Sequence, residues 1–506
     1  MVLLGAIDQG TSSSRFLVFE SDTGDMVASH QIEVKQLYPE EGWVEMDPEE
    51  IYSTVADCME QVCVKLDFMG VNPKELAGIG IANQRETVVV WDKHTGRPLY
   101  NAIVWLDTRT AQLAEEYIER TPIRNKDYFK KKTGLPIHPY FSALKLRWLI
   151  NNVTAVQKAL DEGSLLFGTV DSWLLWKLTG RHITDMSNAS RTLLIDLHKQ
   201  KWSSELCKFF EIPMEILPKI CSSAEVYGPI KHGFLEGVRV AGCLGDQQSA
   251  MVGHGCLRPG EGKNTYGTGT FMLVNTGGCP VLSKHGLLTT VGFKFGNEAI
   301  CYALEGSGSI GGNVVRFLRD NFNFIKESSG VESLAASVPD TAGVYFVPCF
   351  TGLFTPYWDA TARGTICGLT HCATRGHIAL AALKAVTFQT AEMIEAVEQD
   401  IDGLAQIKTL RVDGGMTANL LFNQLQSDAV GRSIVCSRMA EISGWGAAVA
   451  AAIGIGHFTL DEYSAHANKS MMIRFYPKNT DEERCQELNR WKEAVKRARN
   501  WVEASN

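Results

Sequence analysis

Short apolar runs that end in polar turns open the chain. The run Val2–Ile7 meets Asp8 and a Gly-Thr-Ser turn, and Phe16–Phe19 begins the next apolar run. Two apolar runs joined by a short turn of small residues are typical of a β-hairpin. The pattern therefore predicts a hairpin whose turn carries several hydroxyls and one cation, Arg15.

The second half of the chain repeats this pattern. Residues 262–276 place Gly-Thr-Gly-Thr between two strand-like runs, and Asp246 lies shortly upstream. Asp413-Gly414-Gly415 follows the apolar run Ile407–Val412. Three such turns, far apart in sequence, fit a cleft between two similar domains that each lend a hairpin to one polyphosphate.

Helical and strand patterns alternate along the rest of the chain. A helix is predicted to begin after the capping residue Asp47, with Pro48 at its first position, and to end at Gly70. Further helices are predicted at about 109–120, 142–162, 246–254, 375–400, 417–431 and 482–502, and one more helix is predicted to end at Asp320. Strands are predicted at 77–82, 87–91, 165–167, 239–242 and 344–347. Antiparallel hairpins followed by alternating strands and helices indicate α/β domains with mixed sheets.

The length of the chain implies two domains. At 506 residues it exceeds the roughly 250–300 residues at which a single core stops growing. The stretch 253–262 is rich in glycine and contains a proline, so it is the best candidate for a boundary or hinge. We therefore predict domains at residues 1–253 and 254–506.

Composition and charge limit the kinds of binding partner and the cellular compartment that we expect. Hydrophobic residues make up 45% of the chain and charged residues 21%, which is typical of a globular protein. A net charge of −8 argues against nucleic acid or an anionic membrane as a partner. No apolar run approaches the ~18 residues of a transmembrane helix. Thirteen cysteines without a C-x-x-C pair favour a reducing compartment, and we expect a cytoplasmic protein.

The first turn has the residue types of a phosphate-binding loop. Gly10 lets backbone approach a ligand, the hydroxyls of residues 11–14 can donate to phosphoryl oxygens, and the guanidinium of Arg15 can form a fork with them. Asp8 ends a buried strand and can hold Mg²⁺ directly or through its waters. The same residue types are also common in ordinary hairpin turns, and that interpretation stays open for the turn taken alone.

Two further places carry candidate chemistry. Asp246 stands at the start of a predicted helix, where backbone N–H groups stabilise a carboxylate, so we expect it to be ionised and able to act as a general base. Its alternative role is to cap that helix. Arg85 and Glu86 offer donors and acceptors to a polyol, but both can reach one ligand only if the chain turns there. Their alternative role is an ion pair or a pair of exposed charges.

Several motifs resemble those of the FGGY carbohydrate kinase family. They are DQGTSSSR at 8–15, NQRETVVVW at 83–91, GDQQSA at 245–250, NTYGTGTFMLVNTG at 264–277 and DGGMTAN at 413–419, in the family's order. The resemblance implies two actin-like ATPase domains with ribonuclease-H-like cores and a cleft between them for nucleotide and substrate. It also implies ATP and Mg²⁺ as cofactors, glycerol as the acceptor, sn-glycerol 3-phosphate as the product, and a homodimer or homotetramer.

The resemblance also assigns residues to roles. It makes Asp246 the base and a metal-associated residue together with Asp8. The residues that it places at glycerol are Arg85, Glu86, Trp105, Tyr140, Asp246, Gln247 and Phe271. The residues that it places at the nucleotide are Thr11, Ser12, Ser13, Arg15, Thr268, Gly312, Arg316, Gly415 and Asn419.

Some stretches depart from the family pattern. Arg316 stands where bacterial members tend to have Gln, residues 441–446 differ from the usual Glu-Thr-Thr-Ala-Leu-Gly, and residues 306–312 are unusually rich in glycine. Because these positions lie near the implied nucleotide side, the departures predict a weaker affinity for ATP.

Parts of the sequence are also compatible with three alternative functions. Residues 306–311 fit G-x-G-x-x-G, the dinucleotide-binding pattern, but the preceding strands are predicted to be antiparallel, whereas that fingerprint belongs to a parallel βαβ unit. Nucleotide-driven assembly, as in actin-like proteins, would leave Arg85, Glu86 and Asp246 without a purpose. Another polyol or sugar kinase of the same family is the runner-up among enzymes.

Overall fold

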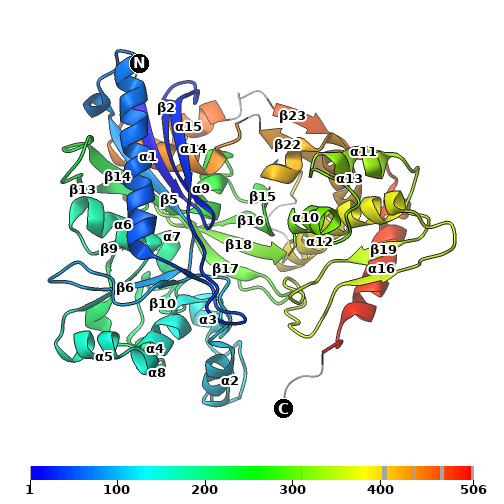
Figure 1. Ribbon diagram of the computed structural model, residues 1–506, viewed down its shortest axis with the longest axis horizontal. Coiled ribbons are helices and arrows are strands. Elements are labelled where there is room, and N and C mark those ends of the chain that lie inside the picture. The colour runs from blue at the N-terminus through cyan, green and yellow to red at the C-terminus, as the bar shows by residue number, and fades with distance from the viewer. Residues whose placement is uncertain (1, 309, 402–406, 438, 468–471, 503–506) are drawn as a thin grey trace.

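Two bodies built on mixed sheets lie side by side in the computed structural model, with helices covering the sheets (Figure 1). The structure describes residues 2–308, 310–401, 407–437, 439–467 and 472–502. No helix within these ranges combines the length and the apolar content needed to span a bilayer.

The first sheet has six strands and contains the predicted N-terminal hairpin. In spatial order the strands are β13 (Ala224–Pro229), β14 (Arg239–Gly245), β5 (Gly78–Asn83), β1 (Leu3–Gln9), β2 (Ser13–Glu20) and β3 (Met26–Glu33). β1, β2 and β3 form an antiparallel meander in which Asp8 pairs with Arg15. β5 runs parallel to β1, and β14 runs parallel to β5. The hairpin prediction is confirmed.

The second sheet has seven strands and repeats this topology. Its spatial order is β17 (Leu288–Phe293), β18 (Cys301–Gly308), β16 (Thr270–Gly277), β15 (Gly262–Tyr266), β21 (Thr409–Asp413), β22 (Ser433–Ser437) and β23 (Met472–Phe475). β15, β16 and β18 form the antiparallel meander, and β21 and β22 continue in parallel from β15. The predicted mixed-sheet α/β class is confirmed. Antiparallel pairing of β18 also removes the parallel context that a dinucleotide fingerprint requires; Ser309 of that motif lies outside the described residues.

α1 packs against β1, β2 and β3 of the first sheet, and the rest of the first half adds a second group of strands and helices. Asp47 caps α1 (Pro48–Phe68) by accepting from the backbone N–H of Glu49, as predicted. This second group contains a four-stranded sheet, β4 (Glu45–Met46), β7 (Ala102–Ile103), β6 (Val88–Asp92) and β8 (Leu165–Thr169). Its helices are α2 (Ala111–Glu119), α3 (Lys130–Thr133), α4 (Ser142–Asn152), α5 (Thr154–Asp161), α6 (Val170–Thr179), α7 (Met186–Ala189) and α8 (Ser204–Phe209). Shorter pieces are β9 (Ile183–Asp185), β10 (Ile195–Asp196), β11 (Lys201–Trp202) and β12 (Lys219–Cys221).

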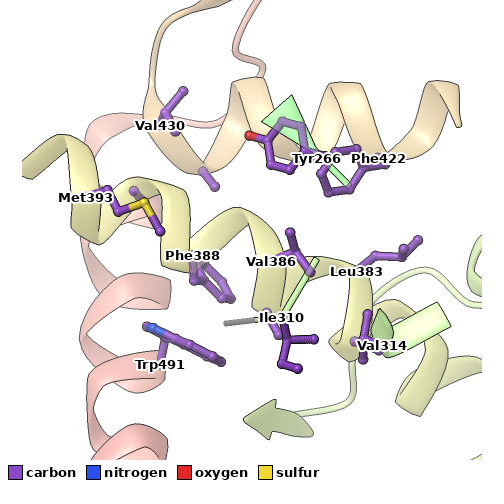
Figure 2. Close-up of a cluster of buried hydrophobic side chains, with 14 of the residues drawn as sticks. Tyr266, Ile310, Val314, Leu383, Val386, Phe388, Met393, Phe422, Val430 and Trp491 are labelled. Atoms are coloured by element: carbon purple, nitrogen blue, oxygen red, sulfur yellow. The ribbon is translucent and has the colours of Figure 1, made fainter. Parts of the chain in front are cut away.

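The long helix α12 (Arg375–Asp400) is the centre of the second half. It packs against the second sheet, a short hairpin and four helices: β19 (Tyr345–Val347) with β20 (Thr365–Cys367), α10 (Asn313–Asp320), α11 (Gly330–Ala336), α13 (Leu420–Val430) and α16 (Asp481–Ala498). Figure 2 shows Phe388 of α12 facing Trp491 of α16, and their rings stack with centroids 5.6 Å apart. The charged C-terminal helix is therefore anchored by a buried aromatic face.

One helix of the second half packs on the first sheet. α14 (Ile442–Gly454) and α15 (Leu460–Ala467) follow β22 in sequence, but α14 lies against β1, β5, β14 and α9 (Asp246–Gly253) (Figure 1). The backbones touch: a Cβ added at Gly80 would lie 1.9 Å from the carbonyl oxygen of Ala447, and one at Gly446 would lie 1.8 Å from that of Ser249. Glycine is what makes this close approach possible.

Two helix predictions need correction. The pattern at 142–162 forms two helices, because Val153 takes an extended conformation that ends α4 and begins α5. The pattern at 417–431 begins as a 3₁₀ turn over Gly415–Ala418, and α13 starts only after Asn419, whose side chain caps it. In both places a local extended residue interrupts a periodic apolar pattern.

Candidate active site

The first hairpin holds its cation beside its acid. Arg15 Nη1 donates to Asp8 Oδ2 at 3.3 Å, and Arg15 Nε donates to Gln31 Oε1 at 2.8 Å. Glu441, just before α14, lies 3.7 Å from the same Nε. Burial raises the pKa of Asp8 to about 6, although Arg15 opposes the shift. The Glu441 and Asp246 carboxylates also raise this pKa, so the region is rich in negative charge.

The hydroxyls of this turn differ in how they are used. Ser13 closes the turn, because its carbonyl accepts from Gly10 N at 2.9 Å. The Ser14 hydroxyl bonds to that of Thr54 inside the core, whereas Ser12 is exposed. Thr11 Oγ1 accepts from the indole Nε1 of Trp105 at 2.9 Å. The phosphate-type turn is therefore joined directly to an aromatic residue predicted at the substrate.

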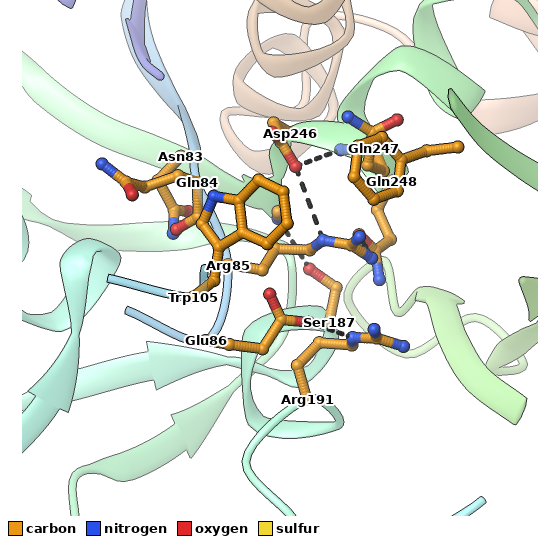
Figure 3. Close-up of polar contacts among 12 residues, drawn as sticks. Asn83, Gln84, Arg85, Glu86, Trp105, Ser187, Arg191, Asp246, Gln247 and Gln248 are labelled. Carbon is orange, nitrogen blue, oxygen red and sulfur yellow. Dashed lines mark hydrogen bonds and ion pairs between the residues drawn. The ribbon is translucent and has the colours of Figure 1, made fainter. Parts of the chain in front are cut away.

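The chain does turn at the Arg85–Glu86 pair. Glu86 has φ +60°, a left-handed conformation that is uncommon for a residue other than glycine. Arg85 Nε lies 3.5 Å from Asp246 Oδ1, and Glu86 Oε1 accepts from Arg191 Nε at 2.6 Å. Figure 3 shows Asp246 and Arg85 pointing toward one another, with Glu86 facing Arg191. The turn that sequence reasoning required is present.

Asp246 follows β14 at the first position of α9. Gly245 is the residue that caps this helix, so the interpretation of Asp246 as its N-cap is wrong. Asp246 Oδ1 accepts from the backbone N–H of Gln247 at 2.7 Å. Burial raises the pKa of Asp246 above its ordinary value, against the lowering effects of Arg85, Lys263 and this hydrogen bond. A raised pKa makes the carboxylate a stronger base than a solvated one.

Aromatic side chains from both halves meet beside this pair. The Trp105 ring packs edge-on against Tyr140 at 5.7 Å and against Phe271 at 5.8 Å between centroids. Phe271 comes from β16 of the second sheet, whereas the other two come from the first half. The three aromatic residues predicted at the substrate are thus brought together.

Lys263 is a buried cation of the site that sequence reasoning missed. From β15 its Nζ donates to Gln247 Oε1 at 2.5 Å and to Thr265 Oγ1 at 2.9 Å. Burial lowers its pKa to about 8, opposed by the carboxylates of Asp413 and Asp246. Since Lys263 engages the oxygen of the Gln247 amide, the NH₂ group of that amide is left to donate elsewhere.

Arg191 and Glu305 were also missed. Both side chains are fully buried, and they bond to Glu86 and Arg85. A signal existed in the sequence, since each is a lone charge in or beside an apolar run: NASRTLLI contains Arg191 and CYALEG contains Glu305. Charges are almost never buried unless they are paired.

The predicted nucleotide residues of the second half gather around two touching loops. Gly311 N donates to the Thr268 carbonyl at 2.8 Å, and Gly312 N donates to that of Gly267 at 2.7 Å. Thr268 itself is exposed. Arg316 lies one turn further along α10 and is exposed as well. The second hairpin is therefore tied by its backbone to the start of α10.

The turn after β21 leaves room for a ligand. Gly414 has φ +93°, and a Cβ there would lie 2.5 Å from the Tyr266 carbonyl oxygen, whereas a Cβ at Gly415 would meet open space. Asn419 accepts from Phe422 N through Oδ1, while none of the described residues bonds to its buried Nδ2. Asp413 Oδ2 lies 2.6 Å from His254 Nε2. Open space at Gly415 and a buried donor without a partner at Asn419 each suit a polar ligand.

A cluster of potential metal ligands lies elsewhere. Asp171, Asp185 and Cys243 are buried with ligand atoms within 4.8 Å of one another, the one such group found in the described ranges. Their oxygens already accept from Thr169, Thr184 and neighbouring residues. Asp8 and Asp246, the predicted metal residues, do not belong to this group. The Asp246 carboxylate raises the pKa of Asp8.

Comparison with known proteins fits this geometry. The N-terminal domain model of the FGGY family of carbohydrate kinases matches residues 3–253, and its C-terminal domain model matches residues 262–455. The chain belongs to the FGGY family of carbohydrate kinases. The resemblance drawn from the motifs is thereby confirmed.

Individual FGGY proteins are similar over the whole length. A Caenorhabditis elegans protein named "Probable glycerol kinase" is 64% identical over 99% of this chain and 100% of its own. The glycerol kinase of Brucella anthropi is 47% identical over 99% of both chains. The crystal structure of Plasmodium falciparum glycerol kinase with ADP superposes with a TM-score of 0.91 at 37% identity, covering 98% of both chains. The actin-like FGGY fold of two domains follows from this match.

Proposed function

We propose that this FGGY kinase transfers the γ-phosphoryl group of ATP to a terminal hydroxyl of glycerol, giving sn-glycerol 3-phosphate and ADP. Full-length similarity to proteins named glycerol kinase supports the substrate. The single observation that carries the proposal is the position of Asp246 Oδ1 3.5 Å from Arg85 Nε. Asp246 follows β14, and the neighbouring strand β5 pairs with β1, which leads into the turn that holds Asp8 beside Arg15.

The acceptor pocket suits a small triol. Arg85, Glu86 and Gln247 supply donors and acceptors for hydroxyls, and the Tyr140 hydroxyl can do both. Trp105 and Phe271 pack edge-on and offer apolar surface to the carbon chain of glycerol. The raised pKa of Asp246 fits a base that takes the hydroxyl proton as the oxygen attacks phosphorus.

The nucleotide would lie between the two hairpins. Thr11, Ser12, Ser13 and Arg15 would bind phosphate oxygens from one side and Thr268 from the other, with Gly312, Arg316, Gly415 and Asn419 around adenosine. The open space at Gly415 and the unsatisfied Nδ2 of Asn419 support this assignment. Asp8 and Asp246 would hold Mg²⁺, and their mutual repulsion makes a divalent cation favourable there. Bound Mg²⁺ neutralises charge on the phosphate oxygens.

We further propose that residues 1–253 bind glycerol and provide the base, while residues 254–506 bind the nucleotide. The repeated topology of the two sheets supports such a division. A homodimer or homotetramer stays a prediction from the family.

The deciding experiment is ADP release by the purified protein with glycerol, dihydroxyacetone, xylulose or gluconate as acceptor. We expect the highest kcat/KM with glycerol. Preference for a pentulose or a hexonate would contradict the substrate and favour another FGGY kinase activity.

A further inference from the structure

Glu305 connects the two halves of the protein beneath the proposed glycerol pocket. It lies on β18 of the second sheet, and its side chain is fully buried. Its carboxylate pairs with Arg85 through Nη1 at 2.5 Å and Nη2 at 3.1 Å, the two-pronged geometry that fixes a guanidinium in orientation as well as distance. The residue that holds Arg85 in place thus comes from the half that does not contain it.

The same carboxylate also holds a second arginine. Arg191 Nη2 donates to Glu305 Oε1 at 3.1 Å, and Arg191 Nε donates to Glu86 Oε1 at 2.6 Å. The result is an alternating row of charges: Asp246, Arg85, Glu305, Arg191 and Glu86. Arg85 and Arg191 together keep the pKa of Glu305 at about 2, despite its burial, so it is a carboxylate at any working pH.

One hydrogen-bond donor of this row of charges has no acceptor among the described residues. Arg191 Nη1 is buried, and none of the described residues accepts from it. The Arg191 guanidinium lies 5.6 Å from the centroid of the Tyr140 ring, so it adjoins a third residue of the proposed pocket. An unsatisfied buried donor is costly, and a hydroxyl of a bound polyol is an acceptor that would satisfy it.

We propose that Glu305 and Arg191 are positioning residues for glycerol: Glu305 fixes the guanidinium of Arg85, and Arg191 fixes the carboxylate of Glu86. This inference rests on the proposed function and deepens it. Neither residue takes the reacting proton. Their effect is on how well the Arg85–Glu86 pair fits the hydroxyls, because a polar group that is free to rotate loses entropy again when substrate binds.

A purely structural ion pair between the halves is the competing explanation. Removal of a structural pair lowers the melting temperature and the amount of folded enzyme, and it leaves the Michaelis constants of the folded fraction unchanged. Removal of a positioning pair raises KM for glycerol and leaves KM for ATP unchanged, since Glu305 and Arg191 bond to none of the residues assigned to phosphate or Mg²⁺. The ratio of the two effects on KM therefore separates the explanations.

The test compares Glu305→Gln and Arg191→Lys with the full-length enzyme and with Glu392→Gln. Glu392 is a suitable control because it is another buried carboxylate of the second half, bonded to Tyr357 and Trp491 and away from the row. For Glu305→Gln we expect KM for glycerol to rise about 10-fold or more, the scale of a lost charge-assisted contact, with KM for ATP changed less than about 2-fold.

Arg191→Lys keeps the charge but loses the fork, so we expect a smaller rise in KM for glycerol. Glu305→Asp should lie between Glu305→Gln and the unmodified enzyme. Should Glu305→Gln not yield folded protein, Arg191→Lys and Glu305→Asp decide the matter by the same ratio.

The possible failures are distinguishable. If the unmodified enzyme releases no ADP with glycerol, the proposed function and this inference both fall. If it is active and the variants keep its KM for glycerol, the positioning role is overturned while the proposed function stands. A rise in both KM values together would also overturn the positioning role.

Discussion

The two sheets end in the same way but carry different chemistry. In the first sheet, the strand parallel to the hairpin is followed by the charged turn at Arg85 and Glu86; in the second, it is followed by Gly414 and Gly415. The hairpin turns differ too, with hydroxyls and Arg15 in one and two glycines around Thr268 in the other. The same topology thus presents polar and charged side chains at the turns of the first sheet and glycine backbone at the turns of the second.

The difference follows the size of the proposed ligands. A triol has few atoms, so donors and acceptors must converge on it from several strand ends. A nucleotide is large and flat, and glycine residues let it lie directly against the backbone because they have no side chain to block it. Substitutions in the two sheets should therefore affect the two substrates differently.

Asp246→Asn addresses the chemistry of the first sheet. An amide cannot accept the hydroxyl proton, so we expect kcat to fall about 10²-fold or more while glycerol still binds. The measurement is steady-state kinetics, together with the thermal shift produced by glycerol. An unchanged kcat would remove Asp246 from the mechanism.

Gly414→Ala and Gly415→Ala form a matched pair for the second sheet. Gly414 has φ +93° and its added methyl would meet the Tyr266 backbone, so we expect a loss of about 1–3 kcal/mol in stability. Gly415→Ala places its methyl in open space, so we expect the melting temperature to stay the same while KM for ATP rises. Thermal denaturation and ATP kinetics of both variants provide the check. Equal effects of the two substitutions on KM for ATP would weaken the interpretation that the nucleotide lies against glycine backbone.

Arg15→Gln tests whether the first hairpin serves phosphate rather than glycerol. Loss of one charge-assisted contact to phosphate should raise KM for ATP about 10-fold, with KM for glycerol changed less than about 2-fold. This is the mirror image of the result expected for Glu305→Gln. A selective rise in KM for glycerol would contradict the assignment.

Two buried carboxylates of the second half offer a smaller contrast. Glu305 faces two arginines and has a pKa of about 2, whereas burial raises the pKa of Glu392 to about 7. The folded state therefore keeps a proton on Glu392 that the unfolded state releases near pH 4.5. The free energy of unfolding falls as pH rises from about 4.5 to about 7. Between pH 6 and pH 8 this group should cost about 1 kcal/mol.

Glu392→Gln should remove that part of the pH dependence. Denaturant unfolding of the enzyme and the variant at the two pH values gives the difference directly. An identical loss of stability in both proteins would show that Glu392 does not carry it.

Local sequence signals were sufficient for much of the fold. The hairpin at Asp8 and the cap at Asp47 follow from residues within a few positions of each other, as does the hydroxyl-rich composition of the first turn. The turn at Arg85 and Glu86 was only a condition for both side chains to reach one ligand, and the aromatic group around Trp105 came from family resemblance. Such resemblance works because motifs at strand ends are contiguous in sequence.

What could not be predicted depends on distant pairings. Arg191, Lys263 and Glu305 each bond to a residue at least 16 positions away in sequence, so their partners become visible only in the folded structure. The same holds for α14, whose fit on the first sheet depends on glycines in both elements. The alternative role of Asp246 as the cap of α9 is wrong because the helix begins one residue earlier than that role requires, with Gly245 as its cap.

The glycine contacts of α14 have a consequence for how this enzyme can vary. Gly80, Gly446 and Gly454 each face a carbonyl oxygen at a distance that leaves room for hydrogen alone. A methyl group at Gly80, Gly446 or Gly454 would push α14 away from β5, α9 or β14, respectively, which lead into or contain residues of the proposed active site. In a saturation mutagenesis library selected for growth on glycerol, these three codons should therefore be as depleted of substitutions as the codon for Asp246, the proposed base, although none of the three is assigned to a substrate.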